Sequence, residues 1–405
     1  MSKFEIKSIQ EMYNCKGQLQ HFKCYAKNYE VLKGWRFIIY SETEGQELPK
    51  WLQSNYDNDF AIIELGAEKR FYYIDEQVYA DFLNSKQNMI FMDTCVELDT
   101  QVVSYLKKYF LDFDNVKLPK DKELLLLYLC SESVNYSALP YLFENSKKID
   151  SNNFEHCYLN LKSYEMFKNF DYYEYKKSGN IKYYKEKSDI LIEVDKTFSM
   201  IKSREFQEQF QDLYNVRDAI YCLLLKAIIV ENVNSKKSEK NKMKILCEFV
   251  NNKLGVVMER EMAICYYYFM HDESTHKFFK KTKVNSKNIL ETIGGMAWDL
   301  THLRLLERLH TFFPVDNLKF AIHPLVTYDN GLKEVARLYP IKMIAFNDKE
   351  VHVCFKKNFL EIYPDAINTL YTEELIQHRR KNFNMDKIKY LIKELENEII
   401  SINGC

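Results

Sequence analysis

The pattern of apolar and polar positions predicts strands near the start of the chain. Short apolar runs that are typical of strands lie at residues 35–40, 60–65 and 71–74. Residues 88–99 read as a further strand, which leads directly into an amphipathic helix beginning at Thr100. The sequence therefore predicts a small α+β region followed by a strand–helix unit.

The last part of the chain repeats the strand–helix pattern. Residues 318–329 form a buried apolar run, and a helix is expected to begin near Asn330. Two strand-like runs at 341–346 and 350–355 are expected to complete the sheet, and a charged helix is expected over 385–401. Strands that alternate with helices favour a parallel sheet with helices on both faces.

The middle of the chain predicts helices. No proline occurs between residues 141 and 313, so nothing in this stretch forces a helix to break. Residues 150–203 are polar with weak periodicity, and residues 232–242 have the composition of an exposed loop. Amphipathic helices are expected over 204–231, 259–281 and 287–310.

These patterns predict an α/β protein with an open parallel sheet and flanking helices. The expected division is an N-terminal α+β region (1–88), the first half of the sheet domain (89–150), an inserted and mainly helical region (151–285), the second half of the sheet domain (286–350), and a C-terminal strand and helix (351–405).

Composition narrows the class of protein. The formal net charge is −1, so a nucleic-acid surface would require basic residues gathered on one face. The start, MSKFEIKSIQ, is not apolar, and no apolar run is long enough to span a bilayer, so a cytoplasmic protein without membrane contact is expected. The ten cysteines form no Cys-x-x-Cys pair and have no histidine at structural-zinc spacing, which favours reduced and mostly buried thiols. The glycines are too scattered for a P-loop, a dinucleotide fingerprint or a nucleophile elbow.

Carboxylates mark the ends of two expected strands. Asp99 and Asp329 each end a strand and come directly before a helix. If both strands belong to one parallel sheet, the two side chains lie at the same edge. Asp299 and Glu144, on helices, are candidates to join them. Because clustered carboxylates repel unless a cation is bound, and because Mg²⁺ and Mn²⁺ prefer oxygen ligands, the pattern predicts a site for a hard divalent ion.

Each acid also has an ordinary structural interpretation. An aspartate before a helix commonly caps it, which applies to Asp99 and Asp329. Glu144 alone is typical of a solvated helix position. Asp299 has apolar neighbours and requires a partner, for which Arg304 is a candidate ion-pair mate.

Two motifs resemble those of PIN-domain ribonucleases. Asp99-Thr100, followed by an apolar helix, resembles the opening motif of that family, and Thr327-Tyr328-Asp329 resembles its last motif. The family places a glutamate on an early helix and an aspartate in a later one, the positions that Glu144 and Asp299 occupy in chain order. The resemblance covers residues 89–150 and 286–346, and an insertion at 150–285 would explain the length between the motifs.

Two positions depart from the family pattern. Gln101 stands where the family frequently has asparagine, which bears on the positioning of the first aspartate. Asp93 offers a competing match to the first aspartate on the same strand, with its side chain on the same face as that of Asp99 if the strand is regular. Asp99 is preferred because the helix begins directly after it.

The resemblance implies a PIN-like, Mg²⁺- or Mn²⁺-dependent endonuclease that acts most often on RNA. Its implied metal ligands and catalytic residues are Asp99, Glu144, Asp299 and Asp329. Many members are toxins or RNA-processing enzymes, so a toxin or antiviral-defence effector with a regulatory protein partner is one expectation. A catalytically inactive PIN-like scaffold that binds RNA or protein is the alternative, and a DNase or flap-type nuclease is a third possibility.

Two further features bear on nucleic-acid binding. Lysines cluster around Phe278 and Phe279, a pattern that suits single-stranded nucleic acid, although a solvated helix end is the commoner meaning. His302 follows Asp299 by three residues on the same helix face and is a candidate to contact a phosphate or a metal. A hydrogen-bonded core histidine is the commoner role for such a residue.

Overall fold

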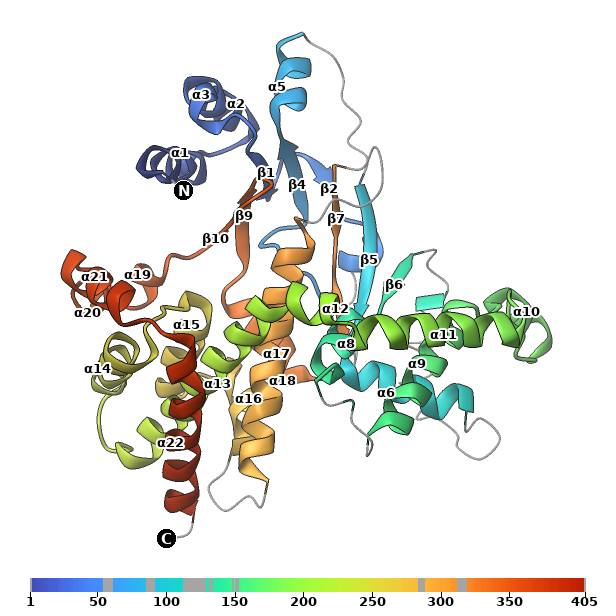
Figure 1. The fold of residues 1–405 in the computed structure, drawn as a ribbon. Coiled ribbons are helices and arrows are strands. Elements are labelled where there is room, and N and C mark those ends of the chain that lie inside the picture. The colour runs from blue at the N-terminus through green and yellow to red at the C-terminus, as the bar shows by residue number, and fades with distance from the viewer. Residues whose placement is uncertain are drawn as a thin grey trace.

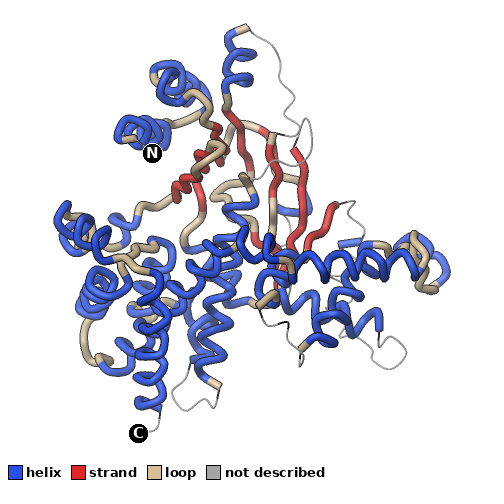
Figure 2. Tube along the Cα trace, in the orientation of Figure 1, coloured by secondary structure: helices blue, strands red, loops and turns tan. Residues whose placement is uncertain are grey.

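Two β-sheets lie at the centre of the molecule, with helices around them (Figure 1; Figure 2). The computed structural model describes residues 2–53, 61–84, 92–111, 129–130, 134–147, 149, 153–282, 288–311 and 319–403. One sheet is antiparallel, with the order β10-β9-β1-β4-β2, and the other is mixed, with the order β3-β8-β5-β6 and β7 also paired to β5. The predicted α/β class is confirmed, but a wholly parallel sheet is not.

The antiparallel sheet combines strands from the N-terminal and C-terminal parts of the chain. Its strands are β1 (Arg36–Ser41), β2 (Gln46–Glu47), β4 (Arg70–Ile74), β9 (Ile341–Phe346) and β10 (Val351–Phe355). β9 pairs antiparallel with both β1 and β10. The prediction that the runs at 341–346 and 350–355 complete the parallel sheet is therefore wrong, because these strands extend the N-terminal sheet instead.

The mixed sheet is built around β5. It comprises β3 (Ala61–Ile63), β5 (Met92–Leu98), β6 (Asn135–Ser137), β7 (Phe320–Ile322) and β8 (Leu325–Thr327). Strands β6, β7 and β8 run parallel to β5, whereas β3 is antiparallel to β8. The expected strand over 318–329 is thus two short strands, and Pro324, which has no N–H to donate to a ladder, lies between them.

Helices precede and flank the N-terminal sheet. They are α1 (Lys3–Asn14), α2 (Gln18–Lys27), α3 (Tyr29–Leu32), α4 (Lys50–Gln53) and α5 (Glu76–Leu83). Helix α1 begins with a capping box in which Ser2 and Glu5 satisfy each other's backbone N–H groups. The start of the chain is therefore helical, a feature that its strand-like runs did not predict.

A second group of helices follows β5 and β6. It contains α6 (Thr100–Leu111), α8 (Leu139–Asn145), α9 (Phe154–Lys168), α10 (Tyr172–Ser178) and α11 (Lys187–Lys202). Helix α9 packs against both α6 and α11. The polar stretch at 150–203 is therefore helical over most of its described residues, although its apolar periodicity is weak.

The third group contains the longest helices. Its members are α12 (Arg204–Gln209), α13 (Gln211–Val233), α14 (Glu239–Phe249), the π-helical turn η1 (Val250–Leu254), α15 (Glu259–Phe269), α16 (Glu273–Phe279), the 3-10 turn η2 (Lys280–Thr282) and α17 (Ile289–Leu309). The helix expected over 259–281 is broken near His271, which has a positive φ of 55°. Helix α17 packs along α13 and continues through Gly294 and Gly295 without a break.

The C-terminal helices pack mainly on the long helices, and the first of them also contacts β3. They are α18 (Asn330–Leu338), α19 (Phe359–Ile362), α20 (Ala366–Thr369), α21 (Glu373–Asn382) and α22 (Met385–Asn403). Helix α22 packs on α13, and α16 packs on α18 (Figure 1). In the part of the chain that the structure describes, no helix is long and apolar enough to cross a membrane.

Candidate carboxylate site

Asp99 and Asp329 lie at the same edge of the mixed sheet. Strand β5 ends at Leu98 and β8 ends at Thr327, and the two strands are parallel neighbours with Leu98 opposite Val326. The backbone N–H of Asp99 donates to the carbonyl of Val326 at 3.1 Å. Parallel strands deliver their carboxyl ends to one edge, which explains why residues so distant in sequence meet here.

The carboxylate of Asp99 bonds across the strands. Its Oδ2 accepts a hydrogen bond from the Thr327 hydroxyl at 2.6 Å, and its Oδ1 accepts one from the N–H of Thr100 at 2.7 Å. A helix cap would accept from the second or third helical N–H instead. Burial is the main cause that raises the pKa of Asp99, and His302 and the Thr327 hydroxyl act in the opposite direction.

Asp329 serves as a helix cap and also faces a cation. Its Oδ1 accepts hydrogen bonds from the N–H groups of Gly331 at 2.7 Å and Leu332 at 3.0 Å, which caps α18. Its Oδ2 accepts a hydrogen bond from Nζ of Lys281 in η2. The capping interpretation is thus correct for one oxygen, and the second oxygen takes part in a separate ionic contact.

Asp299 lies on α17 among the other carboxylates. It is partly buried, and the pKa of its carboxyl is raised well above the ordinary value, first by burial and then by the charges of Asp99 and Asp329. Glu144 raises this pKa further, whereas Lys281 lowers it. Arg304, the suggested ion-pair mate, instead pairs with Glu261 and Glu307.

Glu144 is held beside the same edge by α8. Its Oε2 accepts a hydrogen bond from the Thr100 hydroxyl at 2.7 Å. The ring of the preceding residue, Phe143, packs edge-on against Trp298 at a centroid distance of 5.2 Å, which fixes α8 against α17 next to Asp299. The structure therefore brings all four predicted acids, Asp99, Glu144, Asp299 and Asp329, to one place.

Asp93, the competing match for the first aspartate, lies outside this cluster. It stands near the start of β5, opposite Ala321, and its Oδ2 accepts a hydrogen bond from Asn135 at 2.9 Å. Six residues of extended chain separate it from Asp99, roughly 20 Å at the usual rise of a strand. Asp99 is the aspartate that reaches the other acids.

The cluster includes a buried histidine, for which the sequence favours a hydrogen-bonded core role over contact with a phosphate or a metal. His302, one turn after Asp299, is 1% exposed, and its Nδ1 lies 3.6 Å from Oδ1 of Asp99. Neither ring nitrogen has a hydrogen-bond partner within the described residues. A buried imidazole without a partner is costly, so a ligand or a water at this point would satisfy it.

Lys281 was missed as part of the site. It was grouped with the lysines around Phe278 and Phe279, but both rings are buried and cannot stack on bases. Phe279 stacks on Tyr268 at a centroid distance of 3.9 Å, and Lys277 pairs with Glu334 at 2.7 Å. Of the two interpretations of this cluster, the less favoured one, a nucleic-acid stacking surface, is therefore wrong at these two rings, and Lys283 and Lys287 of the same cluster lie outside the described residues.

Gly331 permits the approach of the segment that carries Lys281. A Cβ at this position would lie 2.9 Å from both the Cα and the backbone N of Phe278 in α16. We expect Gly331→Ala to destabilise the fold by about 1–3 kcal/mol, because α16 must move away from α18. Urea unfolding is the measurement. In the control Gly295→Ala the new Cβ meets nothing, so stability should rise by up to about 1 kcal/mol. Equal effects of the two substitutions would contradict the packing argument.

The four carboxylates are too far apart to bind one metal ion without moving. Across the described residues, three His, Cys, Asp or Glu ligand atoms lie mutually within 4.8 Å only at a different place, formed by Cys95, Glu97 and His323. Binding of an ion would therefore require the four carboxylates to draw closer together, which their repulsion opposes when no cation is bound. The donor set of carboxylate oxygens nevertheless fits a hard divalent cation.

Comparison of the chain with protein-family models, with curated proteins and with solved structures gave no match.

Proposed function

We propose that the chain is a Mg²⁺- or Mn²⁺-dependent endonuclease that hydrolyses phosphodiester bonds in RNA. The observation that carries the proposal is the convergence of Asp99, Glu144, Asp299 and Asp329, with the pKa of Asp299 raised first by burial and then by the charges of the other three. A bound cation would offset the electrostatic repulsion between these carboxylates and would therefore stabilise the folded chain. The choice of RNA rests on the resemblance of the two strand-end motifs to PIN ribonucleases.

The residues of the chain have distinct roles in this proposal. Asp99, Asp299 and Asp329 would hold the metal, and Glu144, which is fixed by the Thr100 hydroxyl, would complete the set. A bound Mg²⁺ or Mn²⁺ would activate a water and stabilise the leaving oxygen of the phosphodiester. The Thr327 hydroxyl orients Asp99 from the neighbouring strand and acts as a positioning residue.

A second candidate function is supported by Lys281. Its ammonium group contacts Asp329 and lowers the pKa of Asp299, so the chain itself supplies one positive charge to the cluster. A catalytically inactive scaffold that binds RNA or protein would need no metal if Lys281 provides the neutralising charge. The two candidates differ in whether a divalent ion replaces this contact.

Cleavage of a mixed RNA pool tests the proposal. We expect the full chain to cleave RNA with Mn²⁺ or Mg²⁺ and to lose this activity when a chelator is added. Single-stranded DNA, duplex DNA and a flap substrate in parallel reactions separate the RNA assignment from a DNase. Absence of cleavage with either metal, or cleavage that the chelator does not affect, would refute the proposal.

Replacement of Lys281 by methionine separates the enzyme from the scaffold. Without metal, Lys281→Met should lower Tm, because the carboxylates lose their nearby cation. With Mn²⁺, the variant should gain more in Tm than the wild type, because the ion no longer competes with the ammonium group.

The matched control is Lys277→Met. Lys277 lies four residues before Lys281, but its ammonium group pairs with Glu334 and not with an acid of the cluster. Its gain in Tm with Mn²⁺ should equal that of the wild type. If Mn²⁺ stabilises neither the wild type nor Lys281→Met, the scaffold is the better account.

A further inference from the structure

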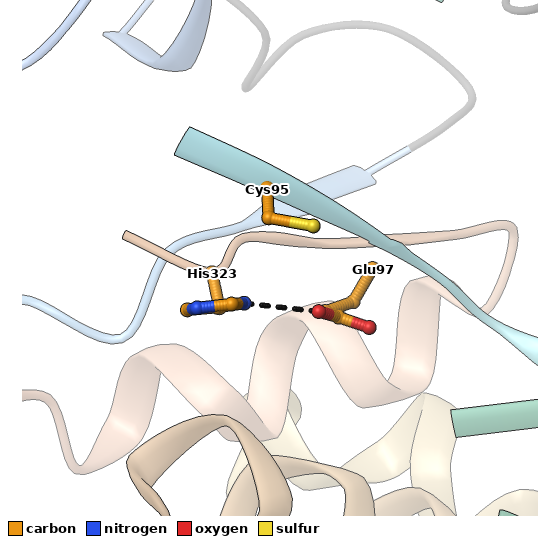
Figure 3. Close-up of side chains that lie close together, drawn as sticks. All are labelled: Cys95, Glu97 and His323. Carbon is orange, nitrogen blue, oxygen red and sulfur yellow. Dashed lines mark hydrogen bonds and ion pairs between the residues drawn. The ribbon is translucent and has the colours of Figure 1, made fainter. Parts of the chain in front are cut away.

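A second group of potential ligands lies on the mixed sheet, next to the four acids but made of other residues. Cys95 and Glu97 project from β5, and His323 follows the end of β7 (Figure 3). One ligand atom from each residue lies within 4.8 Å of the other two. His323 hydrogen-bonds Oε1 of Glu97 through its Nδ1 at 2.9 Å.

The strand register explains why these three residues meet. Asp93 lies opposite Ala321 on β7, and Glu97 lies opposite Leu325 on β8, so one register continues across the gap between the two short strands. His323 is therefore the cross-strand neighbour of Cys95, and Glu97 lies two residues further along the same face of β5. Cys95 and Glu97 come from β5 and His323 from the segment after β7, more than 220 residues later, so no Cys and His spacing in the sequence could reveal the group.

Glu97 provides an independent indication that a ligand belongs here. It is only 1% exposed, and its Oε2 is buried without a hydrogen-bond partner among the residues that the structure describes. A buried carboxylate oxygen with no donor is expensive, and a cation would remove that cost. Cys95 and His323 are less buried than Glu97, so the group is not sealed from solvent.

We propose that Cys95, Glu97 and His323 bind a Zn²⁺ ion. Thiolate, imidazole and carboxylate are all established zinc ligands, and this mixed set selects zinc over Mg²⁺, which prefers oxygen alone. Three protein ligands leave one position of a tetrahedral zinc site for a water. The proposal concerns residues that the nuclease proposal does not use and is independent of it.

A nucleophilic cysteine explains the same residues less well. In a Cys-His-Glu triad the imidazole stands between the thiol and the carboxylate, with one ring nitrogen toward each. Here the ring nitrogen nearest the group, Nδ1 of His323, is bonded to Glu97. Burial, followed by the charges of Glu97 and Asp93, raises the pKa of the Cys95 thiol, whereas a catalytic thiol needs a lowered pKa.

A zinc ion at this point would link β5 to the two-residue segment between β7 and β8. That pairing also sets Asp99 opposite Thr327, two residues beyond Glu97 on the same face. Zinc would therefore stabilise the strand pair that positions the first carboxylate of the nuclease site. Its expected role is structural, and its loss should lower the thermal stability of the whole chain.

Metal binding to the reduced, metal-stripped full chain tests the proposal. Zn²⁺ titrated against a chromophoric chelator should reveal a site that Cys95→Ser and His323→Gln each weaken at least tenfold, because even the loss of a residue that only supports a ligand costs 10- to 100-fold. Co²⁺ in place of Zn²⁺ should give a thiolate-to-cobalt charge-transfer band in the wild type but not in Cys95→Ser. Circular dichroism of the metal-free variants verifies that they fold.

Two controls make the outcome specific. Cys354→Ser changes a cysteine on β10 and should retain both the zinc affinity and the cobalt band. Asp299→Asn should also retain them, so failure of the nuclease site would not affect the result. Wild-type zinc affinity and an unchanged cobalt band in Cys95→Ser, or equal losses in Cys354→Ser, would overturn the assignment.

Discussion

Asp99→Asn should lower Mn²⁺-dependent RNA cleavage by about a thousandfold, since a metal ion contributes several kcal/mol to such reactions. The substitution preserves the shape of the side chain: the amide oxygen can still accept the hydrogen bond from the Thr100 N–H, and the amide NH2 can donate to the Thr327 hydroxyl in place of the bond that Asp99 accepts from it. It removes the negative charge that a hard dication requires. The measurement is the single-turnover cleavage rate of a defined RNA, with circular dichroism to verify the fold.

Asp93→Asn is the matched control for this result. Asp93 is an aspartate on the same strand, but it bonds Asn135 near the opposite end and does not contact the cluster. Its cleavage rate should equal that of the wild type. A wild-type rate in Asp99→Asn, or a similar loss in Asp93→Asn, would contradict a specific role for Asp99.

Asp299→Asn should make the metal-free protein more stable. The pKa of Asp299 is raised by burial and by Asp99 and Asp329, so its charged form is unfavourable in the folded chain. Removal of that charge should stabilise the fold on the order of 1–3 kcal/mol at pH 7.5, because each unit by which the folded pKa exceeds the unfolded pKa costs about 1.4 kcal/mol in the charged state. The same substitution should abolish most of the stabilisation by Mn²⁺, because a ligand is lost.

The stability difference between Asp299→Asn and the wild type should depend on pH. A carboxyl whose folded pKa lies above its unfolded value of about 3.9 binds protons more tightly in the native state. The wild type therefore loses stability as pH rises from about 4 through the folded pKa of Asp299, and the variant does not. Urea unfolding from pH 4.5 to 8 should show a gap that widens with pH. A constant gap, or a less stable variant at pH 7.5, would show that Asp299 is not strained by its neighbours.

Local signals in the sequence predict that Asp99, Asp299 and Asp329 approach one another. Asp99 and Asp329 each stand between a strand and a helix, and the rule for parallel strands then places them at one edge. Asp299 is conspicuous as an acid among apolar helix positions. Glu144 was placed by chain order, and its contact with Thr100 accounts for its position.

Other features depend on contacts between distant segments. Lys281 reaches Asp329 only because α16 packs closely on α18 at Gly331. The runs at 341–346 and 350–355 have the composition of strands, but composition does not specify that the first pairs with β1 and the second with the first. Cys95 and His323 become neighbours through the register of β5 with β7 and β8. Such information resides in the packing and cannot be read from local propensities.

The most direct test of the metal-dependent site is anomalous diffraction from crystals of the chain grown with Mn²⁺. We expect a peak at the edge of the mixed sheet, about 2–2.3 Å from carboxylate oxygens of Asp99, Asp299 or Asp329, with Lys281 displaced from Asp329. The absence of a peak there at millimolar Mn²⁺, with Lys281 still bonded to Asp329, would contradict the account.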